Sequence, residues 1–591
     1  MDKLVCPCPS EELHMNYNHL HETYNSLKNK TLESIKEKVS GTKVRFNDLS
    51  MRDGHQSLFA TRMTGEQISR VLYDIVDCGF YDLEVWGGAT LDVCLRYLDE
   101  NPFERLQMIC DAARGKTYTR ALLRGVNLFG YSPYPPDIVE AFCKAAHGRG
   151  LDIMRIFDAL NDPNNLEAAV KSVKKYKGLV DAAVSYTTGP IYDTAYYTDK
   201  FKTYEELGAD MVTVKDMAGL ATPEVAWELM PALKNHLDIP IKWHSHCTPG
   251  FGHITSVIGL MCGIDMIDTC FLPFAGGSSH PSVELLHAFA KRLGIDDGMD
   301  TSRFAEIDGA LRKVRKELKD YDSFKDIPEP FEVDEELGSM MDDIVILLGF
   351  GEIELATRAM HHLEAKLGFP PPDDAVRAAQ VPGGMLSNMY SQLEGFGMKD
   401  RLGDVLKEIP IVRQACGYVP LVTPTSQIVG VQAVNNVKFG RWKNNITDYV
   451  RLVRGEFGQT PVDIDPKYRE EITGSPEEIR YDATQFDYTL PPTQDFTADE
   501  LYPDREFELL YYLFPKVAGG KDGFLEKRAR ERREQLARDE RDQYLDTVRS
   551  RAQFKLSGKN PRTATLSEEE SEALHTLLVA EVTGEYPNRE L

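Results

Sequence analysis

A repeated strand-and-helix rhythm beginning at Val44 is the feature that most constrains the fold of this chain. Short apolar segments end abruptly at polar residues and recur every 24 to 39 residues, with helix-length segments between them. Because each return crossing of this length needs a helix, the strands are expected to run parallel. Eight such units fit a closed (β/α)8 barrel better than an open sheet. The predicted strands are Val44–Leu49, Asp82–Trp86, Ala121–Asn127, Asp152–Asp158, Asp181–Tyr186, Asp210–Lys215, Ile241–His246 and Asp265–Thr269.

Polar residues at or just beyond the carboxyl ends of these strands support the barrel. In such barrels that face holds the active site, whereas the opposite face is mainly structural. An open doubly wound sheet also binds ligands at this edge, but it normally carries a glycine-rich phosphate loop after its first strand. Residues 47–55 are not such a loop, so we expect a TIM barrel over residues 41–335. The polar residues are Asp53, Arg124, Asp158, Lys215, His244 and His246.

The rest of the chain divides into three further regions. Residues 1–40 are polar and mostly helical in pattern, which predicts an N-terminal arm. Residues 336–460 are mainly helical in pattern, and residues 461–591 form an extension with a highly charged helix over residues 524–554. That helix is either a solvated helix with ion pairs between residues four apart or a docking element for another subunit.

Charge and composition exclude several classes of protein. The 591 residues carry a formal net charge of −25, which disfavours nucleic acid and anionic membranes as partners. No apolar run reaches the roughly 18–20 residues that a membrane crossing needs, and the first residues lack the apolar stretch of a signal peptide. The ten cysteines are scattered through apparent core segments, which fits a reducing compartment better than a disulfide framework. We therefore expect a cytoplasmic protein that binds no nucleic acid.

Two histidines at the end of the seventh predicted strand indicate a metal site. Side chains alternate along a strand, so His244 and His246 point to the same side, about 6–7 Å apart. Taken alone, the pair could be a chance feature of the sequence. In a closed barrel, however, strands one and seven are near neighbours across the eighth. Asp53 can then join the histidines in a two-histidine, one-carboxylate set.

Lys215 ends the sixth predicted strand, next to the histidine pair. A protonated amine repels a dication, but desolvation lowers the pKa of a lysine, and the amine can then take up carbon dioxide as an anionic carbamate. A surface ion pair between Lys215 and Asp216 is the simpler alternative. The interpretation as a metal ligand depends on the other three residues lying nearby.

Seven motifs in one order resemble those of the biotin-dependent pyruvate carboxyltransferases. This family includes the carboxyltransferase domain of pyruvate carboxylase, the oxaloacetate decarboxylase alpha subunit and the pyruvate-side (5S) subunit of methylmalonyl-CoA transcarboxylase. The resemblance covers about residues 44–460 and runs from the predicted barrel into the helical region. The motifs are Leu49–Met63, Glu84–Thr90, Leu122–Asn127 with Gly130 and Tyr131, Val214–Leu220, His244–His246, Pro382–Met389 and Val422–Gly430.

The resemblance implies an enzyme that moves a carboxyl group between N1 of biotin and the methyl carbon of pyruvate, which gives oxaloacetate. The reaction passes through the pyruvate enolate, whose oxygen needs a cation and preorganised donors as charge develops. The family fills its metal site with zinc, manganese or cobalt. The implied ligands here are Asp53, His244, His246 and carboxylated Lys215.

The resemblance also implies the residues that bind substrate and transfer a proton. Arg124 and Gln56 match the pair that binds pyruvate, and a guanidinium suits a carboxylate because it can grip both oxygens. Tyr131 matches a tyrosine that lines this pocket, and Arg52 matches an arginine beside a metal ligand. Ser387 occupies the position of the hydroxyl that passes a proton between pyruvate and biotin, since a hydroxyl both donates and accepts.

Two segments depart from the pattern of the family. Residues 247–250 follow strand seven with a less polar sequence than pyruvate carboxylases usually have. Residues 275–281 replace the family's segment after strand eight. These departures bear on the detail of the substrate more than on the type of reaction.

The motif that carries biotin is absent from this sequence. Neither an Ala-Met-Lys-Met attachment site nor a glycine-rich ATP-grasp segment occurs. We therefore expect biotin to be supplied in trans by a biotin carboxyl carrier protein, together with other carboxylase or transcarboxylase subunits. We expect the chain itself to form a homodimer or a higher oligomer.

The prediction is a carboxyltransferase subunit most like the transcarboxylase 5S subunit. An oxaloacetate decarboxylase alpha-type subunit and a split pyruvate carboxylase subunit are alternatives within the family. An acyl-CoA lyase or synthase of the related barrel group is another, although such enzymes lack the metal-ligating Lys215 and the segment at residues 382–384. A non-catalytic scaffold is disfavoured because all four metal-ligand positions are intact.

Overall fold

The structure is a computed structural model that divides into two compact units, Met1–Tyr488 and Thr489–Leu591. In the part of the chain that it describes, no helix has both the length and the apolar composition needed to cross a membrane. For residues 548–557 it describes the backbone only. The described residues are 26–130, 132–324, 326–557, 567–568, 571–572 and 575.

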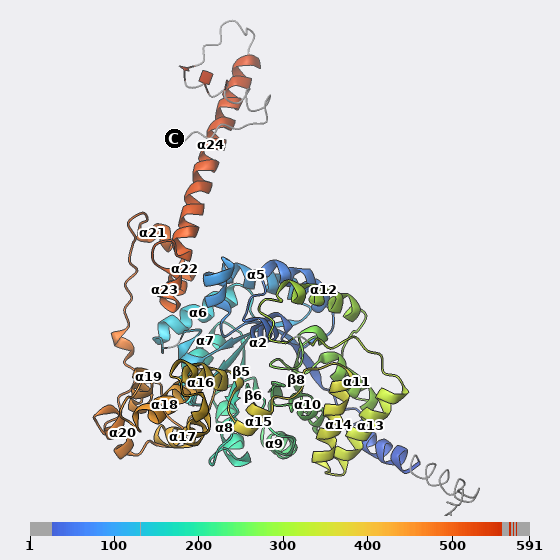
Figure 1. The fold of residues 1–591 in the computed structure, drawn as a ribbon. Helices are drawn as coiled ribbons and strands as arrows, with labels where there is room; N and C mark the ends of the chain where they lie inside the picture. Colours follow the sequence, from blue (N-terminus) through green and yellow to red (C-terminus); the bar gives the residue numbers. More distant parts are fainter. Residues whose placement is uncertain are drawn as a thin grey trace, which may run out of the picture. The chain divides into compact units, whose positions relative to one another are not determined.

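A closed barrel of parallel strands forms the centre of the first unit (Figure 1). Each strand pairs with the next along the chain, and β1 closes the ring on β8, with Asp48 opposite Thr269. The predicted TIM barrel is confirmed. Within the described residues its strands are β1 Arg45–Asp48, β2 Asp82–Trp86, β3 Tyr118–Leu123, β4 Ile153–Phe157, β5 Leu179–Ser185, β6 Met211–Asp216, β7 Ile241–Ser245 and β8 Met266–Thr269.

Amphipathic helices link successive strands on the outside of the ring (Figure 1). The first of them shows why these segments are helical. Thr64 and Gln67 form a capping box at its start, and apolar residues such as Ile68, Leu72 and Ile75 recur on its buried face. The longer helices of this layer are α3 Gly65–Ile75, α5 Pro102–Ala113, α6 Pro136–Gly148, α7 Glu167–Lys175, α8 Thr194–Glu206, α9 Pro223–His236, α10 Gly252–Cys262, α11 Val283–Leu293 and α12 Phe304–Glu317.

Short helical turns occupy several loops at the carboxyl ends of the strands. The prediction that the third strand runs to residue 127 was wrong, because β3 ends at Leu123 and a 3-10 turn follows at Gly125–Asn127. Gly125 has a φ of +40°, and a Cβ there would lie 2.5 Å from the Asn165 carbonyl oxygen. The other turns are η1 Ser50–Gly54, α2 His55–Phe59, α4 Thr90–Val93, η2 Cys94–Leu98, η4 Pro163–Asn165 and η5 Leu272–Phe274.

Six charged side chains fill the interior of the barrel and form what we call the interior ionic cluster. Each of them is fully buried. Arg155 Nε lies 2.8 Å from Asp181, and Lys242 Nζ lies 2.5 Å from Asp82. Because buried charges are tolerated only when they are paired, every cation here contacts a carboxylate. The members are Arg120, Arg155, Lys242, Asp82, Asp181 and Asp268.

A second hydrophobic core lies in the helical region that follows the barrel. It takes in Leu160, a residue of the loop after β4, so the barrel contributes to this core directly. Nearer the start of the region, α14 packs on α13 and also contacts α9 and α10 of the barrel. The helices are α13 Glu335–Gly349, α14 Ile353–Lys366, α15 Asp374–Ala379, α16 Gly383–Gly395, α17 Leu402–Ala415, α18 Thr425–Phe439, α19 Thr447–Arg454 and α20 Pro466–Thr473, with 3-10 turns η6 Lys399–Arg401 and η7 Ala483–Gln485.

The second unit contains the predicted charged helix. Within this unit Arg533 Nε lies 2.6 Å from Glu500 Oε1, and Arg532 donates to the Glu500 backbone carbonyl at 2.6 Å. These contacts join the start of the long helix to the short helix that contains Glu500. The helices of this unit are α21 Ala498–Leu501, α22 Arg505–Leu513, α23 Pro515–Ala518 and α24 Phe524–Ser557.

Candidate metal centre

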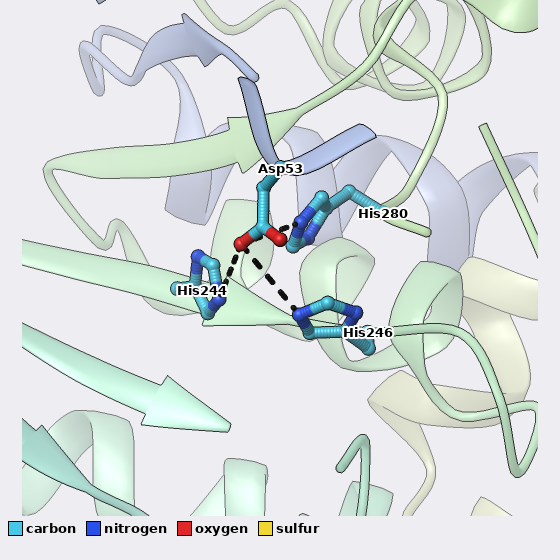
Figure 2. A group of neighbouring side chains, drawn as sticks. All are labelled: Asp53, His244, His246 and His280. Carbon is cyan, nitrogen blue, oxygen red and sulfur yellow. Dashed lines mark ion pairs between the residues drawn. The ribbon is translucent and has the colours of Figure 1, made fainter. Parts of the chain in front are cut away.

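Four buried side chains converge at the carboxyl end of the barrel (Figure 2). Asp53 comes from η1 after β1, His244 and His246 come from the end of β7, and His280 comes from the loop after β8. One ligand atom from each lies within 4.8 Å of all the others. The structure therefore brings Asp53 together with the two predicted histidines and adds a third imidazole.

Backbone carbonyls set the tautomer of two of these imidazoles. His246 donates from Nδ1 to the Ser278 carbonyl at 2.7 Å, and His280 donates from Nδ1 to the Ser245 carbonyl at 3.1 Å. A carbonyl can only accept, so Nδ1 carries the hydrogen, and in the neutral imidazole Nε2 keeps its lone pair. Both lone pairs face Asp53 Oδ2, at 3.8 Å from His246 and 3.4 Å from His280.

His244 is held from behind by the interior ionic cluster. Its Nδ1 lies 2.7 Å from Asp268 Oδ2, and Asp268 is also bound by Arg155 at 2.5 Å. Burial disfavours the charged carboxylate of Asp268, but the arginines of the cluster and the bond from His244 outweigh it and hold the pKa well below its ordinary value. An anionic acceptor behind a ligating imidazole fixes its orientation and raises its basicity as a ligand.

The protonation states of the site suit a cation. Burial and neighbouring charges lower the pKa of His246 to about 3 and hold the pKa of His244 well below its ordinary value. Burial alone would raise the pKa of Asp53, but Arg52 and the nearby histidines outweigh it and hold the pKa well below its ordinary value. Near neutral pH His244 and His246 are therefore neutral and Asp53 is a carboxylate, which are the forms that bind a divalent metal.

Arg52 positions the Asp53 carboxylate. The guanidinium is buried and donates from Nη2 to Asp53 Oδ2 at 2.9 Å, and from Nε to Glu84 Oε2 at 2.8 Å. Glu84 lies on β2 and is also buried. The arginine therefore bridges two carboxylates from neighbouring strands and holds Asp53 with one oxygen toward the histidines.

Lys215 lies directly opposite His244 in the pairing of β6 with β7. Its Nζ is 3.1 Å from His244 Nε2 and the side chain is buried. Burial lowers the pKa of Lys215 to about 8, although Asp53 acts in the opposite direction. The amine is thus beside the centre and close to the balance between its charged and neutral forms at a mildly alkaline pH.

The predicted substrate and proton-transfer residues lie on separate elements. Arg124 follows β3 and donates from Nη2 to the Phe129 carbonyl at 2.7 Å. Gln56 lies in α2, and its Oε1 accepts from the Ala89 backbone N–H at 3.3 Å. Ser387 is an exposed residue of α16 and is not among the four converging side chains. Tyr131 lies outside the described residues.

Sequence reasoning missed His280. The residue lies in the segment 275–281, which departs from the family pattern and has neither strand nor helix periodicity. One signal could have found it. Loops at the carboxyl ends of barrel strands carry the functional side chains, and a histidine in the loop after strand eight is adjacent to strands one and seven in a closed ring.

A closed parallel barrel with a buried carboxylate, imidazoles and a lysine at its carboxyl end defines a TIM-barrel enzyme with a candidate divalent-metal centre. Two family models match this chain. One described as "HMGL-like" covers residues 159–310, and one described as "Conserved carboxylase domain" covers residues 376–572. The second match extends well beyond residue 460, where the resemblance found in the sequence ends.

The chain belongs to the biotin-dependent carboxyltransferases and is a carboxyltransferase subunit of a multi-subunit enzyme. The B subunit of pyruvate carboxylase from Methanocaldococcus jannaschii is 39% identical over 482 residues, which cover 80% of this chain and 77% of that protein. The methylmalonyl-CoA carboxyltransferase 5S subunit of Propionibacterium freudenreichii subsp. shermanii is 32% identical over 492 residues, which cover 80% of this chain and 86% of that protein. The carboxyl transferase domain of Rhizobium etli pyruvate carboxylase, solved with pyruvate and biocytin, superposes with a TM-score of 0.65 at 26% identity, covering 84% and 79% of the two chains.

Proposed function

We propose that this chain transfers a carboxyl group between carboxybiotin, carried on another chain, and pyruvate, with oxaloacetate as the carboxylated partner. The observation that carries the proposal is the buried convergence of Asp53, His244 and His246 beside Lys215 at the barrel mouth. Family membership supplies the reaction type. Two relatives are named as B subunits of pyruvate carboxylase, so we assign pyruvate ahead of the other reactant.

The proposed metal is zinc, manganese or cobalt, with Asp53, His244, His246 and a carboxylated Lys215 as ligands. The residues fit such an ion because neutral imidazole nitrogens and a carboxylate face one another across a buried space. When bound, the ion supplies a Lewis acid that stabilises negative charge on an enolate oxygen.

The environment of Lys215 supports its carboxylation. Carbamate formation needs a neutral amine, and burial lowers the pKa of Lys215 to about 8. A fully exposed lysine would hold its proton about 300 times more tightly, as each pKa unit is a factor of ten. The buried amine therefore has a far larger reactive fraction at the pH of a cell.

Substrate binding falls to residues of the first three loops. Arg124 is proposed to grip the pyruvate carboxylate, and Gln56 to bind an oxygen of the substrate. Tyr131 is proposed to line the same pocket. Arg124 borders a small cavity that Pro424 and Phe457 of the helical region also line. The helical region over residues 336–460 would thereby help to enclose the substrate and the biotin ring.

Ser387 is proposed to carry the proton. In the direction of carboxylation, the C–N bond of carboxybiotin breaks and releases carbon dioxide. The Ser387 hydroxyl gives its proton to biotin N1 and takes one from the pyruvate methyl group, and the resulting enolate carbon bonds to carbon dioxide. Gly383, one turn earlier on α16, faces Thr248 in the loop after β7, since a Cβ added to this glycine would lie 3.7 Å from Thr248 Cγ2. Residues four apart share a helix face, and this neighbourhood of Gly383 supports the role proposed for Ser387.

Partner subunits follow from the proposed reaction. A biotin carboxyl carrier protein must reach the barrel mouth. The remaining partner is a biotin carboxylase if the enzyme is of the pyruvate carboxylase type, or an acyl-CoA carboxyltransferase if it is of the transcarboxylase type. We also propose that residues 461–591 bind partner subunits. Assembly that survives deletion of residues 521–591 would contradict that assignment.

The test uses the purified chain with oxaloacetate and free biotin. We expect slow, biotin-dependent release of pyruvate, measured by coupling to lactate dehydrogenase. The His244→Ala variant is the control because it should keep the barrel but lose the centre. If the wild-type chain releases pyruvate no faster than the variant does, the proposal is contradicted. Purification of the native complex, followed by detection of the biotinylated chain, then identifies the partners.

A further inference from the structure

The loop after β8 is built to hold His280 rigidly. Gly276 donates from its backbone N–H to the His280 carbonyl at 2.8 Å, and Ser279 donates to the Gly276 carbonyl at 2.9 Å. Gly276 and Gly277 have φ angles of +78° and +56°, which L side chains rarely adopt. A Cβ on Gly277 would also lie 2.6 Å from the Phe324 ring. The turn that presents His280 therefore depends on glycine at both positions.

In the neutral imidazole of His280, the lone pair of Nε2 points toward the Asp53 carboxylate. Because Nδ1 donates to the Ser245 carbonyl, Nε2 of the neutral imidazole has no hydrogen to give. Nε2 is buried and has no hydrogen-bond partner among the described residues, yet it lies 3.4 Å from Asp53 Oδ2. In this neutral form, and without an ion, the lone pair and the carboxylate oxygen repel each other. A cation between them converts the repulsion into two bonds.

The spacing of these atoms matches a shared ion. Bonds of about 2.1 Å in a tetrahedral site place neighbouring ligand atoms about 3.4 Å apart. His280 Nε2 is at 3.4 Å from Asp53 Oδ2, closer than His244 or His246, which are both at 3.8 Å. The three imidazole rings form a triangle, in which the His280 centroid is 4.7 Å from His244 and 4.2 Å from His246, while those two are 5.3 Å apart. His280 is at least as well placed as the two histidines of β7.

We propose that His280 is a protein ligand of the metal, so that one aspartate and three imidazoles hold the ion whether or not Lys215 carries a carbamate. The inference rests on the metal centre of the proposed function and goes beyond it in the ligand set. A site of this kind retains its metal in the absence of carbon dioxide. Three imidazoles also favour zinc or cobalt over manganese, which prefers oxygen ligands.

Metal titrations of three variants test the proposal. The full-length chain is stripped with chelator, kept free of carbon dioxide, and titrated with Co²⁺, while bound metal is measured by mass spectrometry and the visible spectrum is recorded. The variants are His280→Ala, Lys215→Ala and the control His253→Gln. The control removes another buried imidazole, which bonds Glu364 at 2.7 Å and lies outside the centre.

We expect the Lys215→Ala variant and the control to bind one Co²⁺ per chain. Loss of His280 should weaken binding by more than about 100-fold, since even removing a group behind a ligand costs about 10–100-fold. Unchanged affinity and spectrum in His280→Ala would overturn the proposal, as would loss of metal in Lys215→Ala alone. If His280→Ala does not fold, His280→Gln and X-ray absorption of the wild-type centre replace it. Three imidazoles in that spectrum support the proposal, and two overturn it.

The same experiment separates this inference from the proposed function. If the wild-type chain binds no divalent ion under any condition, both the proposed function and the role of His280 are contradicted. The wild-type chain can instead bind metal and exchange carboxyl groups while His280→Ala binds metal unchanged. That result contradicts only the role of His280. In that outcome His280 is a charged partner of Asp53 and donates to it as an imidazolium.

Discussion

The interior ionic cluster and the centre at the barrel mouth are both buried collections of polar groups, but they are balanced differently. In the cluster, three cations face three carboxylates, with distances such as 2.8 Å from Arg155 to Asp181. At the mouth, the Nε2 atoms of His246 and His280 lie 3.8 Å and 3.4 Å from one oxygen of the Asp53 carboxylate. The cluster pairs charges of opposite sign in equal number, whereas at the mouth three imidazoles converge on one carboxylate that Arg52 also binds.

This difference indicates which buried polar groups serve stability and which serve binding. A buried group that is fully paired contributes to a unique fold. Ligating nitrogens that converge on a buried carboxylate have a desolvation cost that a bound cation can offset. Asp268 belongs to both sets, because it pairs with Arg155 and accepts from His244.

The largest expected effect is on stability, from breaking the interior cluster. Arg155→Met leaves Asp181 and Asp268 buried without one of their cations, so the free energy of unfolding should fall by about 3–5 kcal/mol. Denaturation in urea, followed by circular dichroism, measures it. A loss below about 1 kcal/mol would show that the cluster is not what holds the barrel interior together.

The next effect concerns Lys215 in the metal-free protein without carbon dioxide. Its pKa is lowered to about 8 from 10.5, so between these values the unfolded chain binds a proton that the folded chain does not. The free energy of unfolding should therefore rise with pH over this window, by about 3 kcal/mol in total. Subtracting the profile of Lys215→Met isolates this part of the pH dependence. A flat difference between the two profiles would contradict the shift.

Removing an imidazole from the mouth should act mainly on function. His246→Ala is expected to lower oxaloacetate decarboxylation by at least about 100-fold, as loss of a group that stabilises developing charge does elsewhere. The rise in melting temperature on adding Zn²⁺ should also shrink, because weaker binding stabilises the folded state less. Calorimetry with and without metal checks the second effect. Equal metal-induced shifts in both proteins would exclude His246 as a ligand.

An exposed ion pair on α14 should contribute much less to stability than the buried interior ionic cluster. Glu354 and Arg358 form an exposed ion pair four residues apart on α14. Solvent screens such a pair, so Glu354→Gln should move the melting temperature by less than about 1 °C. Differential scanning fluorimetry at low and high salt measures it. A shift as large as that of Arg155→Met would mean that burial does not decide the strength of these pairs.

Much of the barrel was predictable, because apolar strand segments alternate regularly with helix-length segments along the sequence. Strand six was expected to end at Lys215 next to the histidine pair, and the structure places Lys215 opposite His244. The end of the third strand was not predictable, because the turn that follows it brings Gly125 close to the Asn165 carbonyl, a contact between distant residues. Such approaches join distant parts of the chain and leave no periodic trace in the sequence.

The site was predictable to the extent that strand order determines proximity. Asp53, His244 and His246 fall at strand ends, so a closed ring must bring them near one another. His280 lies well beyond Thr269, where β8 ends, and only the folded turn at Gly276 shows where it points. The assigned roles of Arg124, Gln56 and Ser387 depend on a bound substrate and stay predictions.

Leu160 has a practical consequence for engineering. This residue lies in the loop after β4, and its side chain is buried in the core of the helical region. A chimaera that joins this barrel to the helical region of a relative near residue 335 would pack Leu160 against a different apolar surface. This mismatch would arise even if every transplanted helix folded correctly. Exchanging specificity between relatives will require carrying the β4 loop along with the helices it supports.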